Sequence, residues 1–279
     1  MLNELRGLYK ISRPLTTLTG GLAVLLGGYV AGTGAWGKVI LATLATWFIT
    51  AAANAWNDYR DIEIDKINQP KRPLPSGMVS PKNVLLFSLT LTALSIILAG
   101  FINLTAFLIA VGSAALLYVY SWRLKSTVLM GNAIVATISA MSAIFGGIAA
   151  GNPRPSLWLA LIIASAIMER EVLKTLADYE GDLRQRCRTI ATVWGRRPAR
   201  IVFYLLAAAT LVVMMLPYML NIYEPVYAFI VALGVYPVLF YVLLRVTRER
   251  SGPQLEKLSQ LMKYDFMVWF LAVILGAAS

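Results

Sequence analysis

The fold is decided by the stretch Val39-Ile-Leu-Ala-Thr-Leu-Ala-Thr-Trp-Phe-Ile-Thr-Ala-Ala-Ala-Asn-Ala-Trp56, a mostly apolar run that leads directly into Asn57-Asp58-Tyr59-Arg60-Asp61-Ile62-Glu63-Ile64-Asp65. About 20 mostly apolar residues carry a helix across the hydrocarbon core of a bilayer, so the run predicts a membrane-spanning helix. The carboxylates follow where that helix leaves the apolar region. The sequence therefore predicts a polar site at a membrane surface.

Eight further apolar runs resemble the first. Of the 279 residues 58% are hydrophobic and 14% are charged, whereas a soluble chain carries about 25% charged residues. This composition excludes a single soluble domain and low-complexity disorder. We expect an all-α integral membrane protein, one domain over residues 1–279 with a bundle of nine transmembrane helices. The nine runs are 15–35, 39–56, 84–102, 104–121, 130–150, 157–176, 201–220, 226–246 and 261–278.

The basic residues predict the orientation of these helices. The chain has 25 Lys and Arg against 14 Asp and Glu, a net charge of +11. All the basic residues except Lys38 and Arg154 fall on the side that carries the amino terminus, and such residues mark the cytoplasmic side. We therefore expect a multi-pass protein of the cell membrane, with its amino terminus and polar loops cytoplasmic and its carboxyl terminus outside. The charge is explained by topology, so no nucleic-acid partner is implied.

The chain has no histidine and a single cysteine, Cys187. This excludes histidine-based triads, histidine-ligated zinc or haem, and an internal disulfide. Carboxylates, amides, Lys, Arg and Tyr must carry any chemistry.

The first acidic motif consists of Asn57, Asp58, Asp61 and Asp65. If the helix continues, Asn57, Asp61 and Asp65 share one face, with Asn54 and Asp58 beside them. Carboxylates on one stripe repel each other where the dielectric constant is low, so a cation is expected there. Hard oxygen ligands without His or Cys favour Mg²⁺, which binds through a few carboxylates and substrate phosphates.

The second acidic motif is Arg170-Glu171-Val-Leu-Lys174-Thr-Leu-Ala-Asp178-Tyr-Glu-Gly181-Asp182, at the end of another apolar run. Glu171, Lys174, Asp178 and Asp182 fall on one helical face by the same spacing. Lys174 could offset the repulsion between these carboxylates or reach the anion that the metal holds. Both motifs contain Asp-Tyr-x-x-Asp or a close variant, which leaves a weak internal duplication open. Glu169 and Glu180 complete an acidic group that we expect at the cytoplasmic surface.

Two aspartate stripes with Mg²⁺ between them form a receptor for a diphosphate, and nearby cations complete it. Arg72 lies in the proline-rich loop Asn68-Gln-Pro-Lys-Arg72-Pro-Leu-Pro-Ser-Gly77, and Lys125 ends Tyr120-Ser-Trp-Arg-Leu-Lys125. Both could be positive-inside charges, but their place in these motifs favours a contact with the diphosphate. The apolar interior suits a substrate with a diphosphate head and a long hydrocarbon tail.

These motifs resemble the UbiA superfamily of intramembrane prenyltransferases over essentially the whole chain. The resemblance rests on Asn-Asp-x-x-Asp-x-x-x-Asp at 57–65, the loop that follows it, and Tyr120-Ser-x-x-x-Lys125. Within the superfamily, the second motif looks most like that of the archaeal digeranylgeranylglyceryl phosphate synthases. The family pattern often has a further Asp where this chain has Lys174, so Lys174 could contact the diphosphate or an acceptor phosphate directly.

The resemblance implies a UbiA-like fold and a Mg²⁺-dependent prenyl transfer. The donor would be geranylgeranyl diphosphate and the acceptor the free glycerol hydroxyl of geranylgeranylglyceryl phosphate, giving an ether of archaeal-type membrane lipids. No obligate protein partner is implied, and lipids surround the bundle. The implied metal ligands are Asn57, Asp58, Asp61, Asp65, Asp178 and Asp182, with Asp61, Asp65, Asp178 and Asp182 as the catalytic carboxylates. The implied substrate-binding residues are Asn54, Arg72, Tyr120, Lys125 and Lys174.

Other interpretations remain open at this point. An aromatic prenyltransferase of quinone biosynthesis would carry the same Asp motifs, with 4-hydroxybenzoate as a typical acceptor. A membrane transporter would also cluster polar residues, although transporter sites generally lie near the bilayer midplane. Asp178 and Asp182 could instead pair with the arginines at 184, 186 and 188. Arg13, at the start of the first apolar run, could meet an acceptor phosphate, but snorkelling to lipid headgroups explains it more simply.

Overall fold

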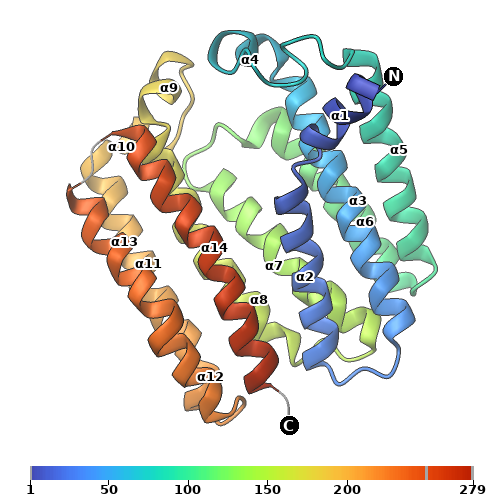
Figure 1. The fold of residues 1–279 in the computed structure, drawn as a ribbon, viewed down its shortest axis with the longest axis vertical. Coiled ribbons are helices and arrows are strands. Elements are labelled where there is room, and N and C mark those ends of the chain that lie inside the picture. Colours follow the sequence, from blue (N-terminus) through green and yellow to red (C-terminus); the bar gives the residue numbers. More distant parts are fainter. Residues whose placement is uncertain (1, 249–250, 278–279) are drawn as a thin grey trace. The chain divides into compact units, whose positions relative to one another are not determined.

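The computed structural model describes residues 2–248 and 251–277, and every regular element in those ranges is helical (Figure 1). The all-α prediction is confirmed. The elements are α1 (Leu2–Ile11), α2 (Pro14–Val30), α3 (Trp36–Arg60), α4 (Ile62–Asn68), α5 (Pro81–Gly100), α6 (Leu104–Val119), η1 (Tyr120–Leu124), α7 (Met130–Ala150), α8 (Ser156–Ala177), α9 (Tyr179–Arg184), α10 (Ile190–Trp194), α11 (Arg196–Met219), α12 (Pro225–Ile230), η2 (Val231–Val235), α13 (Tyr236–Arg248) and α14 (Gly252–Gly276).

Each predicted apolar run overlaps a long helical segment, but several ends differ. Helix α2 stops at Val30, five residues before the predicted end, because the chain turns at Gly32 with φ +66°. Helix α14 begins at Gly252, nine residues before the predicted start. Its first turns are amphipathic, with Leu255 and Leu258 buried while Gln254 and Lys257 are exposed and Glu256 is half-buried. A continuous apolar run cannot reveal such an extension.

Seven helical segments in the described part of the chain are long and apolar enough to cross a membrane: Trp36–Arg60, Pro81–Gly100, Leu104–Leu124, Met130–Ala150, Arg196–Met219, Pro225–Val246 and Gly252–Gly276. The chain is thus a multi-pass membrane protein. The other two predicted spans differ in simple ways. Helix α2 has only 17 residues, and α8 carries four charged residues between Glu169 and Lys174. Membrane crossing by these two helices stays a prediction.

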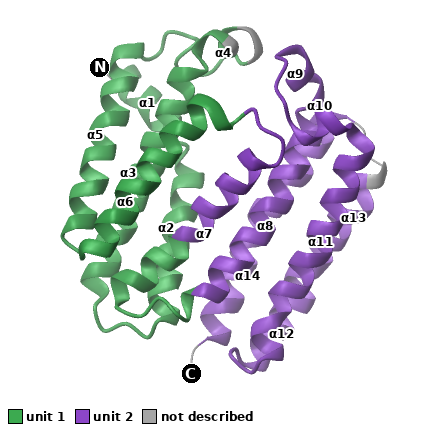
Figure 2. Cartoon of the chain, turned by 180° about the vertical axis from the view of Figure 1, so that it is seen from behind, with its two compact units in different colours: residues 1–125, 142–156 green, residues 126–141, 157–279 purple. Residues whose placement is uncertain are grey.

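The chain divides into two compact units (Figure 2). Unit 1 consists of Met1–Lys125 and Ser142–Ser156, and unit 2 of Ser126–Met141 and Leu157–Ser279. Helix α7 therefore contributes to both. The first acidic motif belongs to unit 1 and the second to unit 2.

In unit 1, helix α3 packs against α2 and α5. The core between the helices is rich in alanine and valine, including Val24, Val39 and Ala45. Small residues let membrane helices approach closely, and α2 and α7 illustrate this: a Cβ on Gly146 would lie 1.9 Å from the carbonyl oxygen of Val24. This packing fixes the helix that precedes the first motif.

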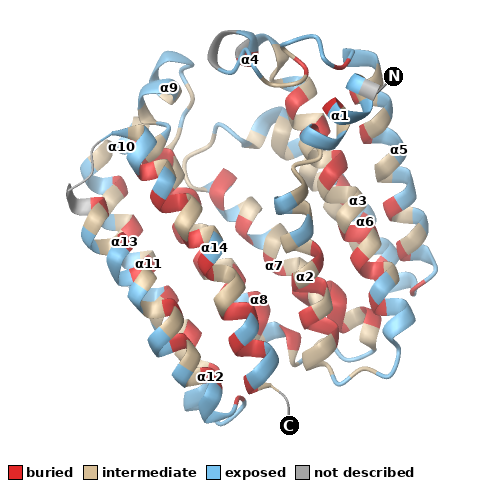
Figure 3. Ribbon diagram, in the orientation of Figure 1, coloured by how far each residue is buried: buried red, intermediate tan, exposed pale blue. Residues whose placement is uncertain are grey.

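In unit 2, helix α14 packs against α12, η2 and α13. Tyr227 donates a hydrogen bond of 2.6 Å to the carbonyl oxygen of Met214 and accepts one of 3.1 Å from Trp269 Nε1. Both ring polar groups are therefore satisfied inside an apolar core. Figure 3 shows that buried positions alternate with exposed ones along α14 and α3, as expected of helices with one packed face and one face toward lipid.

Candidate active site

The first acidic motif lies at a joint between two helices of unit 1. Helix α3 ends at Arg60, Asp61 has φ −91° and ψ 6°, and α4 begins at Ile62. Helical hydrogen bonding continues across the joint, because the Asp61 amide donates to Asn57 at 2.9 Å and the Asp65 amide donates to Asp61 at 2.8 Å. The predicted i, i+4 relation of Asn57, Asp61 and Asp65 is therefore kept although the helix bends.

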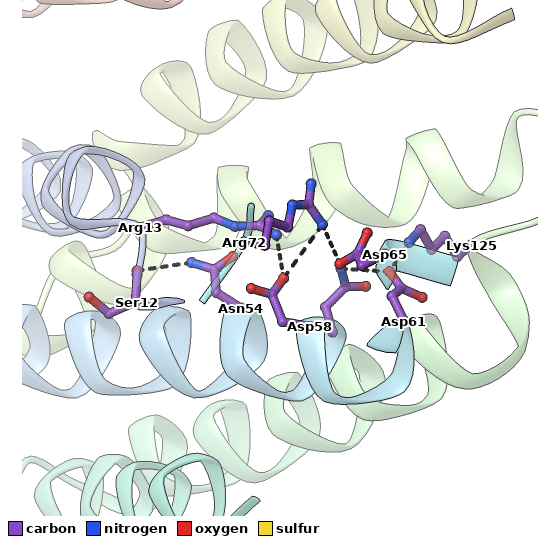
Figure 4. A network of polar contacts seen from close by, with 9 residues as sticks. Ser12, Arg13, Asn54, Asp58, Asp61, Asp65, Arg72 and Lys125 are labelled. Atoms are coloured by element: carbon purple, nitrogen blue, oxygen red, sulfur yellow. Dashed lines mark hydrogen bonds and ion pairs between the residues drawn. The ribbon is translucent and has the colours of Figure 1, made fainter. Parts of the chain in front are cut away.

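Asp58 points toward the corner between α1 and α2 (Figure 4). It is 4% exposed, and its Oδ1 accepts a hydrogen bond of 2.7 Å from Arg13 Nη2. Asn54, one turn earlier, donates a hydrogen bond of 3.1 Å to the carbonyl oxygen of Ser12. The prediction that Arg13 snorkels toward lipid is not what the structure shows, because its guanidinium group is held on a buried carboxylate 45 residues away.

Asp65 is held by Arg72 from the proline-rich loop. Arg72 Nη1 donates to Asp65 Oδ2 at 2.6 Å and lies 4.0 Å from Asp58 Oδ1. The loop is shaped by turns, among them Gly77 with φ +75°, and its Leu74 and Val79 side chains are buried. It therefore fixes Arg72 between two carboxylates of the motif.

Asp61 is held by Lys125, which follows the one-turn π-helix η1. Lys125 Nζ lies 2.5 Å from Asp61 Oδ2, and Asn57 Nδ2 donates to the same oxygen at 3.1 Å. The wider turn is closed by the Lys125 amide, which donates to Tyr120 at 2.9 Å. Such π-turns are frequent at functional sites, and this one brings Lys125 to the motif. Tyr120 is half-buried.

Unit 1 thus gathers the predicted residues Asn54, Asn57, Asp58, Asp61, Asp65, Arg72 and Lys125 along one side of α3 and α4. Each carboxylate has a cationic partner, as the predicted repulsion requires. In the described ranges, no three Asp, Glu or Cys side chains are grouped closely enough to hold a metal ion by themselves. The oxygen-only donors still fit Mg²⁺, which normally takes further ligands from water and phosphate. Lys125 and Arg72 occupy the carboxylates that the metal would use.

The second acidic motif has the same backbone arrangement in unit 2. Helix α8 ends at Ala177, Asp178 has φ −86° and ψ 3°, and α9 begins at Tyr179. The Asp182 amide donates to Asp178 at 2.8 Å. Asp178 is exposed and Asp182 is half-buried.

Lys174 is paired within its own helix. Its Nζ lies 3.0 and 3.2 Å from the two carboxylate oxygens of Glu171. Arg170 lies beside the same carboxylate at 3.4 Å and donates a 3.1 Å hydrogen bond to the carbonyl oxygen of Ser259 on α14. Lys174 therefore offsets the negative charge of Glu171, one of the two roles that the sequence left open.

Sequence reasoning placed Glu169 with the surface carboxylates and did not single out Asp265. Glu169 is 1% exposed and Asp265 6% exposed, and one carboxylate oxygen of each has no hydrogen-bond partner within the described residues. Asp265 lines a small cavity of unit 2 together with Thr210 and Trp269. Ionisable residues inside membrane helices are uncommon, and this rarity was the available signal in the sequence.

The sequence of residues 15–274 matches the model of the UbiA prenyltransferase family. This chain belongs to that family. Among curated relatives, digeranylgeranylglyceryl phosphate synthase of Methanopyrus kandleri is 36% identical over 77% of this chain and 79% of its own length. The synthase of Thermococcus gammatolerans is 32% identical over 98% of this chain and 99% of its own.

Solved structures support the same family fold. A structure of a digeranylgeranylglyceryl phosphate synthase superposes with a TM-score of 0.79 at 28% identity and covers 99% of both chains. A UbiA homologue from Archaeoglobus fulgidus, bound to GPP and Mg²⁺, superposes with a TM-score of 0.72 at 19% identity and covers 94% of this chain and 99% of its own. The UbiA-like fold predicted from the motifs is confirmed.

Proposed function

We propose that this chain transfers a geranylgeranyl group from geranylgeranyl diphosphate to the free glycerol hydroxyl of geranylgeranylglyceryl phosphate. The observation that carries the proposal is its similarity, over 98% of its length, to a curated digeranylgeranylglyceryl phosphate synthase. The carboxylate stripe of unit 1, with a cation on each carboxylate, supports a site built for a charged head group.

In the proposed reaction the allylic carbon–oxygen bond of the donor breaks and an ether bond forms to the glycerol oxygen. In this proposal the departing diphosphate accepts the hydroxyl proton, so the reaction needs no general base from the protein. Mg²⁺ would be held by Asn57, Asp61, Asp65, Asp178 and Asp182 and would neutralise charge on the leaving diphosphate. Lys125 and Arg72 would move from the carboxylates to the phosphate oxygens, and Lys174 would add positive charge beside Asp178. Tyr120 would line the path of the allylic group.

We further propose that residues 1–279 work as one transmembrane domain, with the amino terminus and both acidic motifs on the cytoplasmic side and the carboxyl terminus outside. The distribution of basic residues supports this orientation. The partners are a prenyl diphosphate, a lipid-like acceptor and the surrounding lipids.

The test is a comparison of acceptors. Purified protein receives labelled geranylgeranyl diphosphate and Mg²⁺ with either geranylgeranylglyceryl phosphate or 4-hydroxybenzoate. We expect label only in the ether-linked product. Transfer only to the aromatic acid would refute the proposed acceptor while leaving a prenyltransferase, and no Mg²⁺-dependent transfer to either would favour a transporter.

A further inference from the structure

The carboxylate stripe of unit 1 has two ends with different partners (Figure 4). At one end, Asn57 and Lys125 share Asp61. At the other end, Asp58 holds Arg13, and Arg72 stands between Asp58 and Asp65. Asp58 and Asp61 are three residues apart, which is about 4.5 Å along a helix axis. The two ends are thus close enough to serve two parts of one reaction.

Two arginines on one buried carboxylate are suited to an anion. Arg13 and Arg72 are 40% and 37% exposed in their side chains, whereas Asp58 is 5% exposed. Among the described residues, Arg13 uses one N–H for Asp58 and Arg72 uses one for Asp65. A guanidinium group carries five N–H donors and matches a phosphate in a bidentate manner. Asp58 therefore anchors Arg13, Asp65 anchors Arg72 beside it, and each guanidinium group keeps further N–H donors for a ligand.

The backbone conformation at Arg13 is unusual and is held in place by hydrogen bonds. Arg13 has φ 50° and ψ 67°, a left-handed conformation that is uncommon for a residue other than glycine. The conformation forms the corner between α1 and α2, and Asn54 fastens this corner to α3 through the carbonyl oxygen of Ser12. Thr17 donates to the same carbonyl at 2.7 Å. A charge that merely reached for lipid headgroups would need no such fixed corner.

We propose that Arg13 binds the phosphate group of the acceptor and that Asp58 is its positioning residue rather than a metal ligand. This inference rests on the proposed function. In a glyceryl phosphate the reacting hydroxyl is only a few bonds from the phosphate, so the phosphate must bind beside the donor site. Arg13 meets this need at the Asp58 end, while Asp61 and Lys125 serve the donor diphosphate at the other. Arg72, between them, can contact either anion.

The test measures steady-state kinetics of Arg13→Gln in detergent, with each substrate varied separately. We expect the KM for geranylgeranylglyceryl phosphate to rise about tenfold to a hundredfold, the loss expected for a charge-assisted contact. The KM for geranylgeranyl diphosphate and kcat at saturation should stay within about twofold. Lys10→Gln is the matched control, since it removes an exposed positive charge from α1 and should leave both KM values unchanged.

Two further variants test the same proposal if Arg13→Gln does not fold. Arg13→Lys keeps the charge but loses the planar fork, so the KM for the acceptor should rise less. Asp58→Asn should raise the KM for the acceptor with no change in the Mg²⁺ concentration needed for half-maximal rate. An increased Mg²⁺ requirement or donor KM in Asp58→Asn, or an unchanged acceptor KM in the Arg13 variants, would overturn the proposal.

The acceptor phosphate can also be removed instead of the arginine. Wild-type protein should have a higher kcat/KM for geranylgeranylglyceryl phosphate than for phosphate-free geranylgeranylglycerol. Arg13→Gln should reduce this preference by about the same factor by which it raises the KM for the glyceryl phosphate. A preference that survives Arg13→Gln would overturn the proposal. Failure of the proposed function looks different, because the wild-type protein itself would then not use the glyceryl phosphate.

Discussion

The two acidic motifs share a backbone design but differ in their electrostatic setting. Asp61 and Asp178 each stand at a helix joint with nearly equal dihedral angles, and each accepts a 2.8 Å bond from the aspartate four residues later. In unit 1 the cationic partners come from other elements: Arg72 lies in the loop that follows α4, and Arg13 and Lys125 are distant in sequence. In unit 2, Lys174 is paired with Glu171 of its own helix. The first motif is thus shaped by tertiary structure and the second largely by one helix.

The largest expected effect is on catalysis, and it tests whether both motifs matter equally. Asp61→Ala and Asp182→Ala should each lower kcat/KM by about a thousandfold, since each removes a ligand that helps to neutralise the leaving group. Glu63→Ala and Glu180→Ala are matched controls, because these exposed carboxylates lie within two residues of the tested aspartates, in α4 and α9. Circular dichroism should show that each variant keeps its helices. Near-normal activity of either aspartate variant would then show that its motif does not belong to the active site.

The second effect concerns binding. Mg²⁺ with geranylgeranyl diphosphate at about 100 times its Kd should stabilise the detergent-solubilised protein by about 2.7 kcal/mol, measured as a rise in Tm. Chelation of the metal should abolish most of the rise, because the carboxylates and the diphosphate then repel each other. Donor alone giving the same rise would contradict the metal site, as would an unchanged Tm with both present.

The third effect isolates unit 1. Gly146→Ala should destabilise the protein by about 1–3 kcal/mol, because the added Cβ would lie 1.9 Å from the carbonyl oxygen of Val24. Gly112→Ala in α6 is the matched control, since nothing lies within 4 Å of its added Cβ; it should be neutral or slightly stabilising. Equal thermal stability of the two variants in detergent would show that the close contact of α2 and α7 does not contribute to the stability of the protein.

The smallest effect compares the two lysines. Lys125→Ala should reduce kcat/KM by about tenfold, and Lys174→Ala by less, because the charge of Lys174 is already largely balanced by Glu171. A matched charge-conserving variant, Lys125→Arg, should recover part of the loss. A larger loss for Lys174→Ala than for Lys125→Ala would reverse the assignment of roles between the units.

The sequence predicted what depends on local pattern. Apolar length gave the helices, and the spacing of Asn57, Asp61 and Asp65 gave a shared face that survives the bend at Asp61. Helix ends were missed where amphipathic turns extend an apolar run, as in α14. The reason is that hydropathy is averaged over all residues of a segment. A turn with several polar residues has a low average, yet it can still be helical because its apolar residues pack against the rest of the protein.

The partners of the carboxylates could be predicted only in part: Arg72 and Lys125 were expected near the motif, whereas Arg13 was not expected on Asp58. Arg13 is 45 residues from Asp58, and Lys125 is 64 residues from Asp61. No periodic pattern links positions that far apart, because only the packing of α2 and the π-turn before Lys125 bring them to α3. The sequence motifs pointed to Arg72 and Lys125 as nearby cations but did not show which carboxylate each would contact.

The central proposal is that the two motifs bind the same diphosphate through Mg²⁺. The most direct measurement is a double-mutant cycle with Asp61→Asn and Asp182→Asn, read as the Kd of a non-hydrolysable geranylgeranyl diphosphate analogue in saturating Mg²⁺. The account predicts strong coupling between the two positions. The Kd of the double variant should therefore be close to the larger of the two single-variant Kd values. Two losses that multiply independently would contradict it.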